Sequence, residues 1–257
     1  MKRWSTLAVI GGLCAAAVLP LNRSVSPALG AAESMITDGD FDRNVSNRML
    51  RAKEKPQGWY ESRHDKKGRG LLLLSKKSVG GNATKKAMLK ADPTGNAYLT
   101  QALNAPQTGR FTLQWDLYVK QILTPPNRGA YILIGDDSAK KSPGPNATGT
   151  ERFVFLAFEN AATPGKLNLV AVEDGSATPP KSRVVIPDLS AKKWYTMQVA
   201  VDVPGQAYTV SVPGITSAPV PVKAFVSKEK STPKACTHLS FATWNDGPGT
   251  VYIDNVK

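Results

Sequence analysis

The sequence predicts an all-β protein in which two antiparallel sheets pack as a jelly-roll sandwich, forming a single domain after a signal peptide. Three observations support this fold class. Short runs that alternate apolar and polar residues follow one another from residue 58 onward. No amphipathic helix of three turns is recognisable in the mature chain, which argues against Rossmann, TIM-barrel and α/β-hydrolase architectures. A chain of 257 residues is also long enough to bury one large core.

Residues 1–32 are typical of an export signal. Lys2 and Arg3 give a basic start, the apolar stretch 7–21 follows, and residues 28–32 offer small side chains for cleavage. A membrane anchor is the alternative, but the stretch contains Pro20 and is shorter than the roughly 20 residues that a spanning helix needs. We therefore expect a domain over residues 33–257 that is secreted, periplasmic or on the cell surface, with no transmembrane segment in the mature chain.

Cysteine usage fits this expectation. The chain has two cysteines, Cys14 in the predicted signal and Cys236 in the domain, so the mature protein has no internal disulfide. An exported protein without disulfides is typical of bacteria. The two histidines, His64 and His238, are too few for a multi-histidine metal centre.

Two long strands are predicted most clearly, over residues 110–120 and 194–203. In both segments the odd-numbered residues are apolar or aromatic and most of the even-numbered ones are polar, as in a strand with one face in the core. Residues 203–206 form a turn, which makes 194–212 a hairpin. The segments 138–150 and 213–234 are predicted to be long surface loops. The other predicted strands are 58–63, 71–75, 85–90, 97–103, 130–134, 153–159, 166–173, 183–186, 207–212, 238–244 and 250–256.

Short motifs stand at both ends of the mature chain. Residues 36–42 are Ile-Thr-Asp-Gly-Asp-Phe-Asp, residues 58–60 are Gly-Trp-Tyr, and residues 249–256 are Gly-Thr-Val-Tyr-Ile-Asp-Asn-Val. They resemble the chain ends of bacterial β-sandwich carbohydrate-binding modules. The middle, especially 111–119, 193–195 and 208–212, resembles the concanavalin A-like lectin and glucanase superfamily, which includes laminin-G-like domains. The resemblance implies a jelly-roll fold and a carbohydrate-binding function.

The likeness to carbohydrate-binding modules also implies a structural calcium ion. In those modules acidic residues of the first segment and the last strand bind calcium, and Asp38, Asp40 and Asp254 occupy similar places here. Calcium takes six to eight hard oxygen ligands, which carboxylates supply. The alternative is a simple Asp-Gly-Asp turn at 38–40, with Asp254 exposed to solvent.

Sugar binding requires aromatic side chains for sugar faces and planar polar groups for hydroxyls. The outward faces of the two clearest strands carry such groups, and Trp244 stands at a strand end before a Gly/Pro turn, where binding residues often lie. The alternatives are an ordinary solvated sheet face and a tryptophan that caps the core. Trp59, Trp115 and Trp194 are expected in the core. The predicted carbohydrate-binding residues are Gln114, Asp116, Tyr118, Gln198 and Trp244, with Thr196 beside them.

Catalytic signatures are scarce. Retaining glucanases of this superfamily carry two carboxylates in a Glu-x-Asp-x-x-Glu run, and jelly-roll lyases carry a Gln-x-His run. Neither spacing occurs here, and His64 and His238 match neither pattern. The acidic residues Glu151, Glu159, Glu173 and Asp174 could still pair across strands, which keeps an enzyme open as the alternative.

The positive charge is concentrated in one segment. The chain has a formal net charge of +13, and residues 43–90 hold 14 basic residues against 3 acidic ones. Such a segment attracts polyanions in a salt-dependent way. Nucleic acid is not expected as a partner, because there is no recognition helix or RNA-binding motif. An acidic polysaccharide or an anionic envelope surface fits better, and charge that only aids solubility is the alternative.

These observations predict a secreted, non-catalytic, lectin-like protein that binds polysaccharides, preferably acidic ones. Two alternatives remain. The first is a polysaccharide-degrading enzyme of the same fold, either a lyase or a glycoside hydrolase. The second is a structural or adhesive envelope protein without a sugar site.

Overall fold

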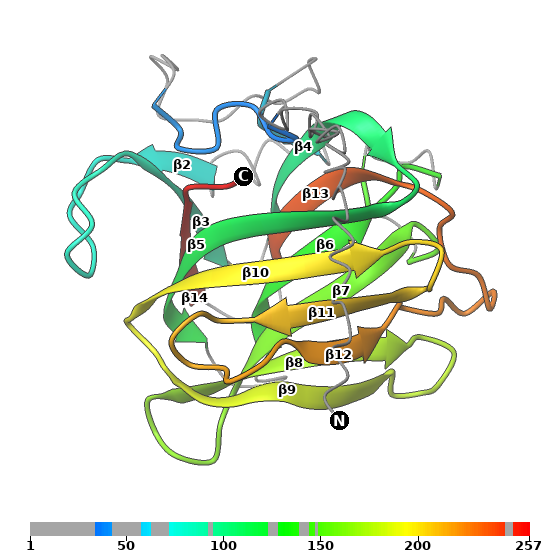
Figure 1. Cartoon of the computed structure of the whole chain (residues 1–257). Helices are drawn as coiled ribbons and strands as arrows, with labels where there is room; N and C mark the ends of the chain where they lie inside the picture. The colour runs from blue at the N-terminus through cyan, green and yellow to red at the C-terminus, as the bar shows by residue number, and fades with distance from the viewer. Residues whose placement is uncertain are drawn as a thin grey trace, which may run out of the picture. The chain divides into compact units, whose positions relative to one another are not determined.

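Two seven-stranded antiparallel sheets face each other across an apolar core (Figure 1). The computed structural model describes residues 34–42, 58–62, 72–91, 95–122, 128–138, 144–146, 149–244 and 249–257. The predicted signal peptide, His64 and half of the basic segment 43–90 lie outside these residues. Within them there is no helix, and so none with the length and hydrophobicity of a membrane span.

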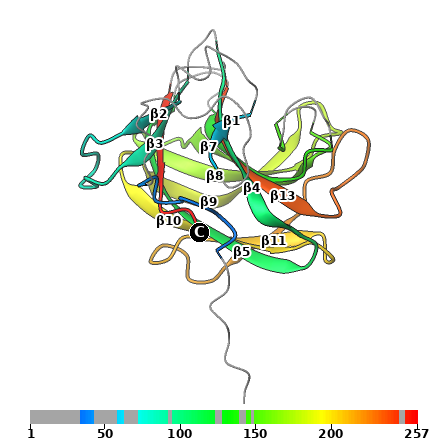
Figure 2. The same ribbon diagram turned by 90° about the horizontal axis from the view of Figure 1, so that it is seen from above.

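We name the two layers sheet A and sheet B. Sheet A has the strand order β12-β11-β10-β5-β14-β3-β2, and sheet B has the order β1-β4-β13-β6-β7-β8-β9. In Figure 1 the strands β10, β11 and β12 of sheet A lie in front, and Figure 2 shows the same layers from above. The strands are β1 Tyr60–Glu61, β2 Leu72–Ser75, β3 Lys86–Ala91, β4 Ala97–Gln107, β5 Arg110–Ile122, β6 Arg128–Gly135, β7 Arg152–Asn160, β8 Lys166–Asp174, β9 Lys181–Ser190, β10 Trp194–Asp202, β11 Ala207–Ser211, β12 Val220–Lys223, β13 Cys236–Thr243 and β14 Gly249–Asp254.

The predicted fold class is confirmed, and so is the pairing of its two clearest strands. β5 and β10 are antiparallel neighbours, with Trp115 opposite Met197 and Leu113 opposite Val199. All four of these side chains are fully buried. The predicted hairpin 194–212 is formed by β10 and β11. Alternation with period two therefore sufficed to place both strands and the face that each one buries.

Aromatic rings connect the two layers inside the core. Trp115 of sheet A meets Phe241 of sheet B edge-on, with ring centroids 5.5 Å apart. Trp59 lies 6.3 Å from the same phenylalanine, and Phe41 lies 5.2 Å from Trp59. Edge-on and tilted contacts of this kind add to the free energy gained from burial. The predicted core positions of Trp59 and Trp115 are confirmed.

One strand falls in a segment predicted to be a loop. β12 lies within 213–234 and pairs with β11, with Pro221 opposite Thr209. A proline lacks the N–H that a central strand donates, but an edge strand tolerates it because one side of its ladder is unpaired. The strand is short and contains this proline, so its alternating pattern was too weak to be recognised in the sequence.

The last strand is held at both of its sides. β14 lies between β5 and β3, and the residues after it continue along β5, where Gln114 N donates to Lys257 O at 2.7 Å. Val256 N donates to Gly39 O at 2.9 Å, so the first described segment lies against the end of the chain. Figure 2 shows the C-terminus beside this part of sheet A. The two chain-end motifs thus meet in space.

Candidate functional site

The outer face of sheet B carries a second apolar cluster, separate from the core. Outer sheet faces are usually polar, so a buried apolar group there indicates a covered or binding surface. Phe225 joins the cluster from the connection between β12 and β13, and Trp244 packs against it from the end of β13. We call this group the sheet B cluster; it comprises Tyr98, Tyr131, Leu133, Phe155, Ala157, Val170, Val172, Phe225, Ala242 and the partly exposed Trp244.

One arginine, Arg152, lies over two aromatic rings of the sheet B cluster. Tyr131 and Trp244 stack with ring centroids 3.9 Å apart and planes 21° apart. The guanidinium carbon of Arg152 lies 4.7 Å from the Phe155 ring centroid and 5.6 Å from that of Trp244. Arg152 Nε donates to Pro145 O at 3.2 Å, which fixes the side chain over the rings. This arrangement combines aromatic surfaces with a cation held in place.

A row of hydroxyl and amide groups continues this face toward β1 and β4. Asn146 Nδ2 donates to Ser62 Oγ at 2.6 Å and to Thr100 Oγ1 at 3.1 Å, and Thr100 Oγ1 lies 2.8 Å from Ser240 Oγ. Gly144 lies over the row with φ of 102°, and a Cβ there would come within 2.9 Å of Thr100 Cγ2. Only glycine fits such a close approach with this backbone conformation. The segment 144–146 is therefore packed onto the sheet.

Two buried titratable side chains lie beside Arg152. His238 is 5% exposed, and its Nδ1 lies 2.7 Å from Thr237 Oγ1. Glu151 is fully buried, and its Oε2 accepts hydrogen bonds from Gly149 N at 2.9 Å and Thr150 Oγ1 at 3.3 Å. In register, His238 and Arg152 flank Gly135 on β6 from its two sides. An imidazole on β13, an arginine at the start of β7 and a carboxyl in the turn just before β7 thus come from adjoining parts of sheet B and its connections.

Only an indirect sign of this face is present in the sequence. β7 reads Phe-Val-Phe-Leu-Ala-Phe from residue 153 to 158, an apolar run without alternation. Such runs are typical of strands buried on both faces. Phe155 and Ala157 belong to the sheet B cluster, while Phe153 and Phe158 belong to the core. Of the predicted carbohydrate-binding residues, only Trp244 lies here.

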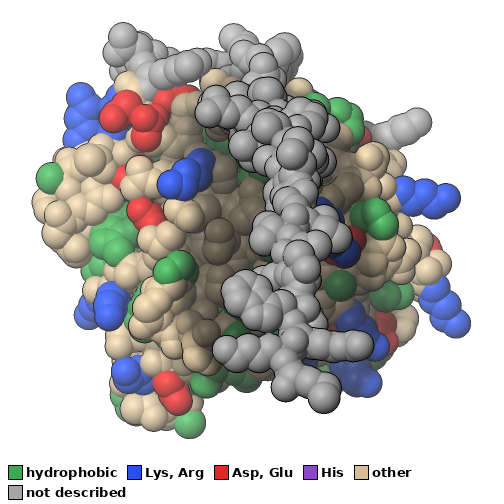
Figure 3. Space-filling view, viewed as in Figure 1, with side chains coloured by type: hydrophobic (Ala, Val, Ile, Leu, Met, Phe, Trp, Pro, Cys, Tyr) green, Lys and Arg blue, Asp and Glu red, His purple; other side chains and the backbone are tan. Residues whose placement is uncertain are grey.

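The other predicted carbohydrate-binding residues come together on the outer face of sheet A. Gln114 lies directly opposite Gln198, and Asp116 lies opposite Thr196. Thr196 Oγ1 donates to Asp116 Oδ1 at 2.6 Å, and Asn255 Nδ2 donates to Asp116 Oδ2 at 2.7 Å. Figure 3 shows this side of the molecule, with lysine and arginine side chains scattered over the part that is coloured.

Tyr118 has a different environment from these polar residues. Its ring lies 5.4 Å from Trp194 and 5.9 Å from Tyr252, and it is only 8% exposed. Burial and the neighbouring Tyr118 raise the pKa of Tyr252. Trp194 is partly exposed on the outer face, and its Nε1 donates to Val79 O at 2.7 Å. The prediction that Trp194 lies in the core was wrong, because it stands opposite Tyr118 in the outward register.

An open groove of about 730 Å³ lies beside the polar part of this face. It brings Asp38 and Asp40, predicted as metal ligands, next to the predicted sugar-binding residues Gln114 and Asp116. We call it the sheet A groove; its lining is Ser34, Ile36, Asp38, Gly39, Asp40, Asp42, Gln114, Asp116, Thr196, Asn255, Val256 and Lys257.

Asp254, the third predicted calcium ligand, is not part of the groove lining. It is 1% exposed, and its Oδ2 accepts hydrogen bonds from Asn82 Nδ2 at 2.8 Å and Thr84 Oγ1 at 2.7 Å. Among the described residues, no three His, Cys, Asp or Glu side chains are grouped as a metal site requires. Calcium therefore stays a prediction, and a melting temperature that is the same with calcium and with chelator would contradict it.

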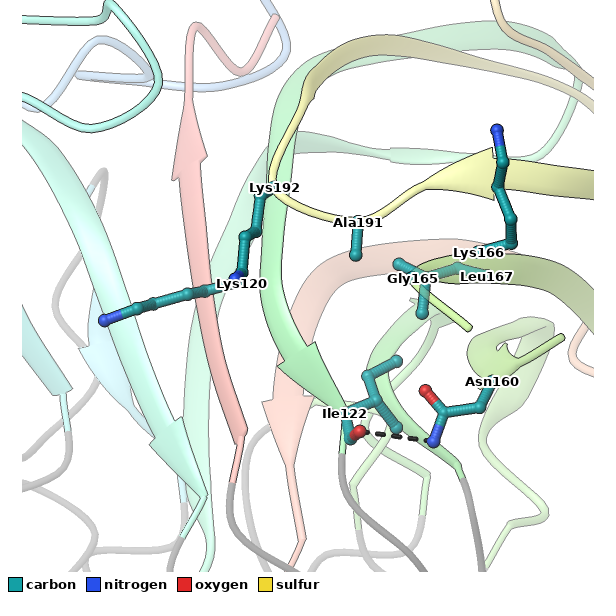
Figure 4. Close-up of a pocket in the computed structure, with 8 residues that line it drawn as sticks. All are labelled: Lys120, Ile122, Asn160, Gly165, Lys166, Leu167, Ala191 and Lys192. Atoms are coloured by element: carbon teal, nitrogen blue, oxygen red, sulfur yellow. Dashed lines mark hydrogen bonds between the residues drawn. The ribbon is translucent and has the colours of Figure 1, made fainter. Parts of the chain in front are cut away.

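A second hollow, of about 350 Å³, lies near the ends of β5 and β7 (Figure 4). Its apolar floor includes Ile122 and Leu167, and Asn160 Nδ2 donates to Ile122 O at 3.2 Å. Lys120 and Lys166 extend in different directions, and Lys166 Nζ lies 3.0 Å from Ser190 Oγ. The amino groups of Lys120 and Lys166 do not converge on a common point (Figure 4).

Comparisons with known proteins establish the fold and no more. No protein-family model matches the sequence, and a search of curated proteins finds no match either. The catalytic domain of a glycoside hydrolase family 131 protein from Coprinopsis cinerea is similar in structure: TM-score 0.50, 14% identity, covering 87% of this chain and 93% of that one. An alginate lyase from Pseudomonas aeruginosa has a TM-score of 0.48 and 10% identity over 81% of this chain and 95% of that one.

A sialidase also matches, with a TM-score of 0.49 and 15% identity over 77% of this chain, but the chain spans only 16% of the length of that protein. The similarity to the glycoside hydrolase domain agrees with the jelly-roll fold that the predicted resemblance implied. Activity has to be argued from the residues of this chain.

Proposed function

We propose that this protein binds a polysaccharide chain on the outer face of sheet B and cleaves it. The sheet B cluster carries the proposal, because it joins stacked rings and a fixed arginine with buried titratable groups on one sheet face. The glycoside hydrolase domain of similar fold supports a polysaccharide as the class of substrate.

Trp244 is the aromatic platform in this proposal. It is partly exposed, its stacking on Tyr131 holds the ring in one orientation, and its Nε1 has no hydrogen-bond partner among the described residues. A flat ring of fixed orientation suits the apolar face of a sugar. Arg152 adds a positive charge beside it, which favours sugars that carry a carboxylate.

Cleavage, rather than binding alone, is suggested by Glu151 and His238. Burying ionisable groups costs free energy, so two of them at this end of sheet B call for a role. A carboxyl and an imidazole near a cation are the groups that general acid–base chemistry on a sugar chain needs. This reverses the preference for a non-catalytic protein that the sequence motifs suggested.

Binding without cleavage is the second candidate. It is favoured by the hydrogen bonds that already occupy these groups, since Glu151 bonds to Gly149 and Thr150, and His238 to Thr237. If Glu151 and His238 serve only to hold the structure in place through these hydrogen bonds, the face binds a sugar chain without cleaving it.

The deciding experiment uses the full chain with alginate, polygalacturonate, laminarin and galactomannan. Retardation in affinity gels and newly formed reducing or unsaturated ends are recorded on the same samples. We expect products from an acidic polysaccharide, and loss of retardation in that polysaccharide when Trp244→Ala removes the platform. The matched control is Trp194→Ala, which removes a partly exposed tryptophan from the opposite sheet.

The outcomes separate the candidates. Retardation without products in wild-type protein would support binding alone, and a product yield unchanged in His238→Asn would remove this histidine from the chemistry. Neither retardation nor products with any of the four polysaccharides would contradict the proposal and favour a structural envelope protein.

A further inference from the structure

The sheet A groove lies on the opposite side of the sandwich from the proposed substrate face. It is lined by residues from the first described segment, from β5 and β10, and from the chain after β14. Its volume of about 730 Å³ falls within the range of roughly 300–1,000 Å³ that is usual for small-molecule sites. The proposed function uses none of its residues.

The polar groups of the groove are held in place by the sheet and by one another. Asp116 accepts one hydrogen bond from Thr196 and another from Asn255, one on each carboxylate oxygen. The backbone of Gln114 is paired to Lys257 through both its N–H and its C=O. Gln114 is partly exposed, and its side-chain amide has no partner among the hydrogen bonds of the described residues. An amide on a fixed strand is thus available to a ligand, at small entropic cost.

Besides the Gln114 amide, the groove is lined by the Thr196 hydroxyl and the Asn255 amide, both of which also bond to Asp116. These groups donate and accept hydrogen bonds in fixed directions, which is how proteins recognise sugar hydroxyls. Trp194 continues the face from Thr196 along β10, and its hydrogen bond to Val79 keeps its partly exposed ring in place. Polar groups and an aromatic surface are therefore combined along one face.

The charge of the groove decides which sugars fit. Asp38, Asp40, Asp42 and Asp116 line it, against Lys257 as the single lysine. Four carboxylates together repel an acidic polysaccharide at close range. The hydrogen bonds from Thr196 and Asn255, one on each carboxylate oxygen, hold the Asp116 side chain in place.

We propose that the sheet A groove is a second carbohydrate-binding site, specific for an uncharged polysaccharide. Gln114 contacts sugar hydroxyls there, and Trp194 extends the contact along the face. The site is separate from the sheet B cluster and does not depend on whether that cluster binds or cleaves anything.

The test is affinity gel electrophoresis of the full chain in laminarin, galactomannan and hydroxyethyl cellulose. We expect retardation in at least one of these neutral gels, unchanged between low and physiological salt, because no charged ligand is involved. Gln114→Ala should weaken that retardation about three- to tenfold, the usual effect of one or two lost hydrogen bonds.

Thr112→Ala is the matched control, because Thr112 is exposed on the same face of β5 but is absent from the groove lining. It should leave retardation unchanged. No retardation in any neutral gel would overturn the proposal, as would an equal loss in Thr112→Ala and Gln114→Ala. Loss in Trp244→Ala but not in Gln114→Ala would place neutral-sugar binding on sheet B and also overturn it, whereas failure of cleavage alone would leave it standing.

Discussion

Lys86 is fully buried, although it belongs to the basic segment that was expected to attract polyanions. Its Nζ donates to Lys77 O at 3.1 Å and also to Thr84 O. Burial lowers the pKa of Lys86, and the nearby Asp254 carboxylate raises it. Asp254 in turn holds the segment 79–84 through Asn82 and Thr84. These two charged residues therefore stabilise one loop and do not form part of a binding surface.

Asp254→Ala tests this role. The variant removes a carboxylate near the buried Lys86 ammonium group, together with the three hydrogen bonds that it accepts from Asn82, Thr84 and the backbone N of Asn255. We expect the free energy of unfolding to fall by about 3 kcal/mol, because hydrogen bonds to a buried charged group are lost. Urea unfolding measures it, with Asp42→Ala as the control, because Asp42 is exposed. Equal stability of the two variants would show that Asp254 does not anchor the loop.

Cys236 gives a second prediction at the scale of one residue. Burial, with a smaller contribution from Asp136, raises the pKa of its thiol to about 12. Since only the thiolate reacts, the folded protein should resist maleimide at pH 7.5 and react after denaturation. The Cys14→Ser variant leaves Cys236 as the one thiol to follow. Rapid labelling of the folded protein would contradict the burial.

The raised pKa of Cys236 also determines whether the free energy of unfolding rises or falls with pH. An unfolded cysteine titrates near 8.5, while the folded one keeps its proton to about pH 12. The folded state therefore binds more protons between these values, and stability falls as pH rises above about 8.5. Cys236→Ala should remove this contribution, and the slope of unfolding free energy against pH above 8.5 should become less steep.

At the scale of elements, the chain ends depend on one glycine. A Cβ on Gly39 would lie 1.7 Å from Val256 O, and Gly39 O accepts the hydrogen bond from Val256 N. A contact this short forces the backbone apart. The segment 34–42 would then lose its attachment to the end of the chain, and the sheet A groove would lose one wall.

Gly39→Ala should therefore lower the melting temperature by several degrees, at about 2–4 °C per kcal/mol for a domain of this size. Gly109→Ala is the control, because nothing lies within 4 Å of a Cβ at that position. A melting temperature of Gly39→Ala equal to that of Gly109→Ala would show that the first segment is not clamped. Differential scanning fluorimetry is sufficient for the comparison.

Over the whole molecule, the two proposed sites lie on opposite faces of a sandwich whose layers are about 10 Å apart. They share no residue and differ in charge, with Arg152 at one and four carboxylates at the other. An acidic and a neutral polysaccharide should therefore bind together. Retardation in a neutral gel should persist when soluble alginate is added in excess. Competition between the two would show that they share one site.

Strand patterns in the sequence predicted the architecture well, because each residue of a strand faces either the core or the outside. β5 and β10 were placed correctly for this reason, and the short, proline-containing β12 was not. Trp194 was assigned to the wrong face because it is the first residue of β10. No strand residues precede it there to show which face the alternation gives it. The predicted polar residues on β5 and β10 do lie together, since adjacent strands bring matching positions side by side.

By itself the sequence determined the fold class, the inward faces of the main strands and the polar row that includes Gln114, Asp116 and Gln198. The tertiary structure decided the rest. It placed Trp244 on the opposite sheet from that row, covered Tyr118 with Trp194, and bound Asp254 to a loop. The reason is physical: alternation is a local property of one strand, whereas the neighbour of an outward side chain is set by strands far away in the sequence. Arg152, Phe155 and Trp244 meet only because β7 and β13 both pair with β6.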